Sequence, residues 1–235
     1  MKRIIKIVSI STLLLLTLLA GAFLYSRPWK NALFISPLYQ LNTSQKVIAL
    51  TFDDGPSDAR TPALLDLLKQ KQVLVTFFML GRNIKKHPNI AQRVYQEGHL
   101  IGNHSYSHPR MILKSPGFLK SEILRTEQLI QSLGQQEVKY FRPPYSSKFI
   151  VLPLVLSSLD KVLVTGTYDP PAEYGSPYKA QKVAKQVVQN AQPGSIIYLH
   201  DGKKSDPAAF VKSVEIIIDQ LHAQGYRFVR LDQIK

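Results

Sequence analysis

The feature that most constrains the fold of this chain is a regular alternation of strand-like and helix-like segments. Strands separated by helices favour a parallel sheet, and seven such units over about 190 residues favour closure into a barrel. We therefore expect an α/β domain whose chemistry lies at the carboxyl ends of the strands. The strand-like runs, rich in β-branched and aromatic residues, are residues 46–52, 73–79, 99–104, 138–142, 161–167, 195–200 and 227–231.

Helical periodicity and end signals appear between these runs. Thr61 followed by Pro62 is typical of a helix start, and Gly98, Gly134 and Gly225 stand where helices are expected to stop. The apolar stretch between Tyr145 and Asp160 is interrupted by Pro153, and we expect a short helix there. The other predicted helices are residues 61–71, 87–98, 117–134, 178–191 and 207–225.

The N-terminus predicts a membrane anchor or a signal peptide. A basic start is followed by nineteen uncharged residues, Ile7 to Tyr25, which is close to the ~20 residues that span a bilayer. Residues 20–22 (AGA) also form an acceptable cleavage site. We slightly favour an uncleaved anchor, and both interpretations place the domain outside the cytoplasm. The expected organisation is residues 1–26 as anchor or signal peptide, 27–45 as juxtamembrane linker and 46–235 as the folded domain.

Charge and composition narrow the function classes. The formal net charge is +14, from 30 basic and 16 acidic residues, which favours an anionic neighbourhood such as a membrane surface or an acidic polymer. A basic surface that serves only solubility is the simpler interpretation. There is no cysteine, so thiolate catalysis and cysteine metal sites are excluded. No phosphate-binding glycine loop or basic-aromatic run is present, which disfavours a phosphoesterase or nuclease, and no nucleic-acid partner is expected.

Polar side chains follow the strand-like runs at several points. Asp53 and Asp54 come directly after the first run, and two adjacent carboxylates at a buried strand end are costly unless a positive group lies nearby. The later groups are His104 and His108, then Arg142 to Tyr145, Asp169, and His200 with Asp201. Taken singly, each group is more often a turn, a surface histidine or an extended loop. Their shared position after consecutive strands indicates one site.

Two histidines and one carboxylate suggest a metal site. His104 and His108 are four residues apart, and Pro109 disfavours helix at His108, so the turn that joins them is expected to be short or irregular. A set of two histidines and one carboxylate commonly binds catalytic zinc and leaves a position open for water. Asp54 can supply the carboxylate. The cation would then neutralise one aspartate and Arg142 the other.

The motifs TFDDGPS (51–57), HSYSH (104–108), RPPY (142–145) and YLH (198–200), in this order, resemble those of polysaccharide deacetylases, the NodB homology domain of carbohydrate esterase family 4. The resemblance runs from about residue 46 to the C-terminus. It implies a distorted (β/α)7 barrel and metal-dependent removal of N-acetyl groups, or in some members O-acetyl groups, from sugars.

The resemblance also implies roles for individual residues. Asp54, His104 and His108 would bind a divalent metal, with zinc expected. Asp53 would be the general base, held and kept ionised by Arg142, and the backbone N–H of Tyr145 would stabilise the oxyanion. His200 would protonate the leaving amine, Leu199 would line the acetyl pocket, and Asp169 would orient His200.

One motif departs from the family pattern. An aspartate followed by an aspartate–tryptophan pair is expected, whereas the chain has TYDPPAEYGSPY, and its single tryptophan is Trp29, far upstream. Tyr168 and Tyr174 are both candidates for the aromatic role. The acetylated glycan therefore stays open among peptidoglycan, another exopolysaccharide and chitin-type oligosaccharides. A non-catalytic carbohydrate-binding relative and an O-acetyl esterase are the alternatives.

Overall fold

The computed structural model describes residues 2–203 and 206–234. Within these residues, seven parallel strands form one curled sheet in the order β5-β4-β3-β2-β1-β6, and β7 pairs with the start of β1. The strands are β1 (Val47–Asp53), β2 (Thr76–Met79), β3 (Leu100–Asn103), β4 (Tyr140–Phe141), β5 (Val162–Leu163), β6 (Ser195–His200) and β7 (Arg227–Phe228). This arrangement confirms the predicted α/β class and the distorted barrel with seven strands.

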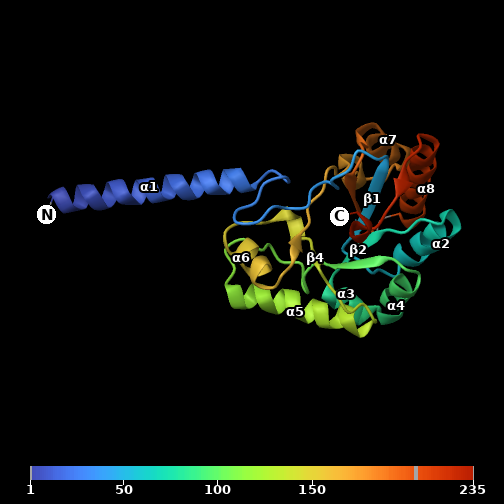
Figure 1. Cartoon of the computed structure of the whole chain (residues 1–235), viewed down its shortest axis with the longest axis horizontal. Coiled ribbons are helices and arrows are strands. Elements are labelled where there is room, and N and C mark those ends of the chain that lie inside the picture. The colour runs from blue at the N-terminus through green and yellow to red at the C-terminus, as the bar shows by residue number, and fades with distance from the viewer. Residues whose placement is uncertain (1, 204–205, 235) are drawn as a thin grey trace.

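Helices cover the outside of the sheet (Figure 1). The α-helices are α1 (Lys2–Ser26), α2 (Thr61–Lys71), α3 (Gly81–Lys86), α4 (Pro88–Gln96), α5 (Pro116–Ser132), α6 (Val151–Ser158), α7 (Ala180–Asn190) and α8 (Pro207–Ala223). The described residues also contain three short 3₁₀ helices: η1 (Pro144–Ser146) after β4, η2 (Pro171–Tyr174) between β5 and α7, and η3 (Leu231–Gln233) after β7. The predicted helix over residues 61–71 has the same bounds as α2, and α6 lies in the stretch where a short helix is expected.

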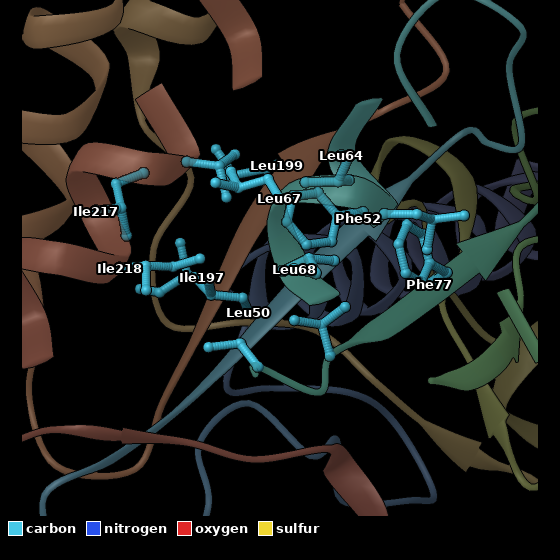
Figure 2. Packing of buried hydrophobic residues seen from close by; sticks show 14 of the residues in the cluster. Leu50, Phe52, Leu64, Leu67, Leu68, Phe77, Ile197, Leu199, Ile217 and Ile218 are labelled. Atoms are coloured by element: carbon cyan, nitrogen blue, oxygen red, sulfur yellow. The ribbon is translucent and has the colours of Figure 1, made fainter. Parts of the chain in front are cut away.

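Alternation along β1 decides which of its side chains face the core. Ile48, Leu50 and Phe52 point toward the helices, and Phe52 stacks on Phe77 of β2 with ring centroids 5.3 Å apart. Figure 2 shows this layer closing against α2 and α8. The intervening residues of β1, Val47 and Ala49, pack in a second cluster inside the curl. Asp53 continues the inward series, so its carboxylate faces the inside of the barrel.

The curled sheet is completed by chain that precedes the first strand. Leu38 forms a parallel bridge with Val164, just after β5, and Gln40 forms an antiparallel bridge with Ser195 of β6. Leu41 is buried, and its N–H donates to the carbonyl of Gly194. Residues 38–41 therefore lie between the two edges of the sheet, and a bridge between Tyr168 and Ile197 joins those edges further along.

The N-terminal helix α1 extends away from the domain (Figure 1). Among the described residues, Ser9–Ser26 is the one helical stretch long and apolar enough to cross a membrane, and most of it has no cover from the rest of the protein. Only its end contacts the domain closely: Ser26 is buried, and the ring of Phe23 meets that of Phe149 edge to face at 5.6 Å. These features fit an anchor or a signal sequence equally well.

Candidate active site

The carboxyl ends of the parallel strands surround one cleft of about 430 Å³. Asp53 ends β1 and His200 ends β6, and the two residues are register partners on neighbouring strands. His104 follows directly after β3. The cleft is lined by Trp29, Asp53, Asp54, His104, His108, Arg110, Pro143, Tyr145, Ser146, Asp169, Tyr174, Tyr198, His200 and Lys203.

Asp54, His104 and His108 present ligand atoms to one point, all within 4.8 Å of one another. Asp54 Oδ1 lies 3.1 Å from His108 Nε2 and 3.4 Å from His104 Nε2. Although Asp54 Oδ1 is buried, it has no hydrogen-bond partner among the described residues. Burial alone would raise the pKa of the Asp54 carboxyl, but the two imidazoles hold it well below its usual range. A carboxylate without hydrogen-bond partners beside two imidazole nitrogens is a donor set that fits a divalent cation.

Each histidine is aimed by the chain around it. His104 Nδ1 lies 2.7 Å from the carbonyl oxygen of Arg142, and this contact turns Nε2 toward Asp54. The loop between the histidines is irregular, as expected, since His108 has a φ of 63° rather than a helical value. Glu122 of α5 fastens this loop, because its carboxylate accepts hydrogen bonds from the backbone N–H groups of Tyr106 and Ser107.

Helix α3, which the sequence analysis does not predict, supports both ligand-bearing loops. The N–H of Gly81 donates to the carbonyl of Ser105, and the Asn83 side chain donates to the carbonyl of Asp54. Asp54 itself has a φ of 71°, in the left-handed region that is unfavourable for residues other than glycine. Gly202, two residues after β6, packs against this turn so closely that a Cβ there would clash with the Asp54 carbonyl oxygen. The turn at Asp54 is therefore held from two sides.

Asp53 and Arg142 form a buried ion pair beside Asp54, His104 and His108, the three residues called here the candidate metal-ligand group. Arg142 Nη1 donates to Asp53 Oδ1 and to Thr51 Oγ1, each at 2.7 Å, and both charged side chains are almost fully buried. The guanidinium lies between two aromatic rings, 4.1 Å from the centroid of Phe78 and 3.8 Å from that of Tyr198. The second oxygen of Asp53, Oδ2, faces His104 Nε2 at 3.9 Å and so lies toward the metal-ligand group.

Glu173, rather than the expected Asp169, holds His200. Glu173 accepts hydrogen bonds from the backbone N–H of His200 at 2.7 Å and lies 2.8 Å from Nδ1. Asp169 instead accepts from the hydroxyl of Tyr174 at 2.8 Å. The reason is local: η2 returns the chain to the strand end, so its third residue reaches His200. Burial alone would lower the pKa of His200, but the buried Glu173 carboxylate raises it to about 9.

Leu199 does not line the cleft. It is fully buried in the cluster between sheet and helices, as Figure 2 shows. Alternate residues of a strand face opposite sides, so the residue that shares the side of His200 is Tyr198. Tyr198 lines the cleft. The alternation of side chains along β6 is a sequence signal that predicts Tyr198, rather than Leu199, on the side of the cleft.

Besides Tyr198, six residues that line the cleft were not among the predicted site residues: Trp29, Arg110, Pro143, Ser146, Tyr174 and Lys203. Tyr174, left open beside Tyr168 as an aromatic candidate, packs edge to face on His200 with ring centroids 5.6 Å apart. Lys203 Nζ lies 3.7 Å from the centre of the Tyr174 ring and 3.9 Å from Glu173 Oε2. Trp29 comes from the segment expected to be a linker, and no local sequence pattern predicts that it reaches the cleft.

A second group, Asp169, Glu173 and His200, also has its ligand atoms within 4.8 Å of one another. Its environment differs from that of the first group. Glu173 binds His200 through both carboxylate oxygens, and Asp169 accepts from Tyr174 at Oδ2, although its Oδ1 is buried without a partner in the described chain. The ammonium of Lys203 also lies 3.9 Å from Glu173. A cation would have to displace the contacts with Tyr174, His200 and Lys203, so of the two groups in the described residues, that of Asp54, His104 and His108 fits a metal better.

A family model described as polysaccharide deacetylase matches residues 40–159. A peptidoglycan-N-acetylglucosamine deacetylase of Bacillus cereus is 37% identical over 184 residues, which cover 78% of this chain and 66% of that protein. The chain thus spans just under two thirds of that relative. A second protein of the same description and organism is 33% identical over 198 residues, covering 83% of this chain and 91% of its own length.

Solved structures show the same fold. A crystal structure of a peptidoglycan N-acetylglucosamine deacetylase superposes with a TM-score of 0.79 at 34% identity, covering 83% of this chain and 91% of the other. A pseudoenzyme of the CE4 family from Bacillus anthracis gives a TM-score of 0.76 at 23% identity, covering 85% and 68%. The second likeness shows the fold alone, and it makes clear that the fold occurs with and without activity.

Proposed function

The chain belongs to the polysaccharide deacetylase family, and we propose that it hydrolyses N-acetyl groups on the amino sugars of an acetylated glycan. The observation that carries the proposal is the convergence, in one cleft, of a metal-ligand group, a buried Asp53–Arg142 pair and a His200–Glu173 pair. Amide hydrolysis needs an activated water, a stabilised oxyanion and a proton for the leaving amine, and these three groups can supply them.

The cation of this proposal is divalent, with zinc as the expected ion, held by Asp54, His104 and His108. Two imidazole nitrogens and one carboxylate oxygen are the ligands of many catalytic zinc sites. A cation bound there would supply Lewis-acid polarisation of the acetyl carbonyl and a more acidic water. The carbonyl of Arg142 contributes indirectly, because its contact with His104 Nδ1 leaves Nε2 free as a ligand atom.

Asp53 is the general base in this mechanism. Its Oδ1 accepts a hydrogen bond from Arg142, which fixes the orientation of the carboxylate, while Oδ2 faces the metal-ligand group. A base must lie within hydrogen-bond reach of the water whose proton it takes, and Oδ2 is the Asp53 oxygen on that side. Because Arg142 is itself fixed by Thr51 and two aromatic rings, the carboxylate has little freedom to turn away.

His200 is the general acid. Its Nδ1 is engaged by Glu173, so Nε2 is the atom that can give a proton to the departing sugar amine. A pKa of about 9 keeps the imidazole protonated at neutral pH, which is the state an acid requires. The backbone N–H of Tyr145, a residue held at a φ of 57°, is the proposed donor to the oxyanion.

We propose that the enzyme works outside the cytoplasm. It is either held at the membrane by α1 or released after α1 is cleaved. An apolar helix at the N-terminus and a formal net charge of +14 fit a protein that works beside an anionic envelope polymer. Peptidoglycan is the substrate we favour, since the two curated relatives described above are peptidoglycan-N-acetylglucosamine deacetylases. Chitin-type oligosaccharides and other exopolysaccharides are the alternatives for the assay.

The test is release of acetate by the full chain in detergent micelles, with peptidoglycan, N-acetylglucosamine oligomers and an O-acetylated glycan as parallel substrates. Each substrate is incubated with zinc, with cobalt and with a chelator. We expect metal-dependent acetate release from N-acetylated substrates and loss of activity with the chelator. Metal bound in the expected amount but no acetate from any substrate would identify a non-catalytic relative instead. Release from O-acetyl groups alone would identify an esterase.

A further inference from the structure

Trp29 forms part of the wall of the catalytic cleft. It is the single tryptophan of the chain, and it lines the same cleft as Asp53 and His200 although it lies before the first strand of the sheet. Its indole packs on the ring of Tyr198 with centroids 5.3 Å apart and planes inclined by 37°. The side chain is only half-buried, so part of the ring is open to the cleft.

The position of Trp29 is fixed by the sheet rather than by the free end of a linker. Its carbonyl oxygen accepts a hydrogen bond of 2.8 Å from Thr165 Oγ1. Further along, Leu38 exchanges backbone hydrogen bonds with the chain after β5: its N–H donates to Leu163, and its carbonyl accepts from Thr165. Thr165 thus fastens the segment at two points, and the indole is held in a defined place beside the strand ends.

A short series of contacts connects the indole with the proposed base. Tyr198, on which Trp29 packs, covers the guanidinium of Arg142 at 3.8 Å, and Arg142 binds Asp53. The indole is therefore separated from the Asp53–Arg142 pair by one aromatic ring. A sugar whose acetamide lies at Asp53 and the metal ligands would have its ring, or that of the next sugar, near this wall.

We propose that Trp29 is a substrate-contacting residue, whose indole packs against a pyranose ring of the bound glycan. The inference rests on the proposed function, because it takes the cleft to be the site of an amino-sugar polymer. Its chemistry is that of aromatic recognition: the face of a pyranose ring that carries C–H groups is apolar, and a half-exposed indole offers it a large rigid surface. The segment between α1 and the sheet then contributes directly to specificity.

Trp29 stays in the mature chain whether α1 is cleaved or kept. Cleavage after Ala22 would leave Trp29 and all of residues 38–41 in the mature chain, and an uncleaved anchor would keep them as well. The candidate membrane span ends at Ser26, three positions before Trp29. With α1 in a bilayer, the glycan contact proposed here would lie close to the membrane surface.

A first experiment uses the emission of Trp29 itself. Because no other tryptophan is present, indole fluorescence of the full chain in detergent micelles reports on this position alone. The chain is treated with chelator to prevent turnover and titrated with an N-acetylglucosamine pentamer or with muramidase-digested peptidoglycan. We expect a saturable change in intensity or emission maximum. Acetate release by the metal-loaded enzyme, measured in parallel, separates this inference from the proposed function.

The outcomes are distinct. Acetate release with unchanged indole emission overturns the contact at Trp29 and leaves the deacetylase in place. A saturable emission change without acetate release from the metal-loaded enzyme supports the glycan contact and overturns the proposed activity. No change and no acetate with either glycan overturn both.

A second experiment separates contact from support. Trp29→Ala should raise KM about five- to tenfold with kcat changed less than about twofold, and Trp29→Phe, which keeps an aromatic face, should restore most of the affinity. Phe34→Ala is the matched control, since Phe34 is 65% exposed in the same segment and is not among the cleft residues. A loss confined to kcat, or equal KM values for all three variants, would overturn the contact. The phenylalanine variant keeps this test informative if the alanine variant fails to fold.

Discussion

The carboxylate of Glu173 contacts His200 at two atoms: it accepts a hydrogen bond from the backbone N–H at 2.7 Å and lies 2.8 Å from Nδ1. The side chains of Glu173 and His200 are both largely buried. The double contact fixes the imidazole plane and leaves the other ring nitrogen, Nε2, facing the hydroxyl of Tyr174 at 3.5 Å. It also sets the charge of the ring, because a buried carboxylate at this distance favours the imidazolium. One carboxylate, that of Glu173, therefore both orients the imidazole of His200 and raises its pKa. It lies four positions after Asp169, the residue that the sequence analysis favours.

Replacing Glu173 with Gln should move the basic limb of the pH profile to lower pH. The folded pKa of His200 is raised from 6.5 to about 9, so its protonated form is lost only as pH rises through that value. Without the carboxylate we expect the fall in kcat/KM to begin about one pH unit lower or more. The same raised pKa stabilises the folded protein below pH 6.5, and this contribution is lost as pH rises toward 9.

Asp169→Asn is the matched control for this variant, because Asp169 binds Tyr174 rather than His200 Nδ1. Both kcat/KM profiles are measured from pH 5 to 10 at saturating metal, so that any effect of the cation on His200 is common to them. A basic limb that moves further in Asp169→Asn than in Glu173→Gln would return the positioning role to Asp169.

Asp53→Asn and His104→Ala should separate catalysis from metal binding. Asp53 contacts Arg142 and faces the ligand group without belonging to it, so its amide variant should keep the metal and lose kcat by about a hundredfold or more. His104→Ala removes a ligand atom and should lose the metal. Metal content by elemental analysis and acetate release are measured on the same samples. His222→Ala, a change at an exposed histidine of α8, should alter neither quantity. Full turnover by Asp53→Asn would remove the base assignment.

The sequence predicts the strand ends well because each is marked by a change from apolar to polar residues. Asp53, His104 and His200 lie where that boundary predicts, around one cleft. The partner of His200 was harder to predict, since Asp169 and Glu173 are both carboxylates of one loop and only the turn of η2 decides between them. For Leu199 the information was present: strand alternation places Tyr198, two residues before His200, on the side of the cleft.

Two features have no local signature. Helix α3 is six residues long, too short for a periodic pattern, yet it supports the loops of Asp54 and Ser105. Trp29 reaches the cleft only because residues 38–41 fill the space between β5 and β6, a contact between parts of the chain more than a hundred residues apart. Such long-range placement depends on closure of the sheet, which a motif does not describe.

Truncation should show that the domain begins before residue 46. A chain starting at Arg27 retains Leu38, Gln40 and Leu41, whereas one starting at Lys46 loses the buried Leu41 and the backbone hydrogen bonds that join β5 to β6. We expect the shorter chain to be less stable by about 2–4 kcal/mol, from one buried leucine and a few hydrogen bonds. Urea unfolding followed by circular dichroism gives the comparison. Equal midpoints and slopes for the two chains would make residues 27–45 a linker, as the sequence analysis expects.

Arg142 should be needed for stability as well as for turnover, and two substitutions distinguish these contributions. Arg142→Met keeps an apolar stem between Phe78 and Tyr198 but leaves Asp53 buried without its cation. Removing one partner of a buried pair costs about 3–5 kcal/mol, so we expect a large fall in the free energy of unfolding together with loss of activity.

Arg142→Lys keeps the charge but cannot bridge Asp53, Thr51 and the carbonyl of Thr165 at once, because an ammonium lacks the planar fork. It should recover part of the stability and little of kcat. In the double variant with Asp53→Asn, the stability cost of Arg142→Met should shrink, since no buried charge is left unpaired. An undiminished cost in that double-mutant cycle would mean that Arg142 acts through its packing on the two rings and not through Asp53.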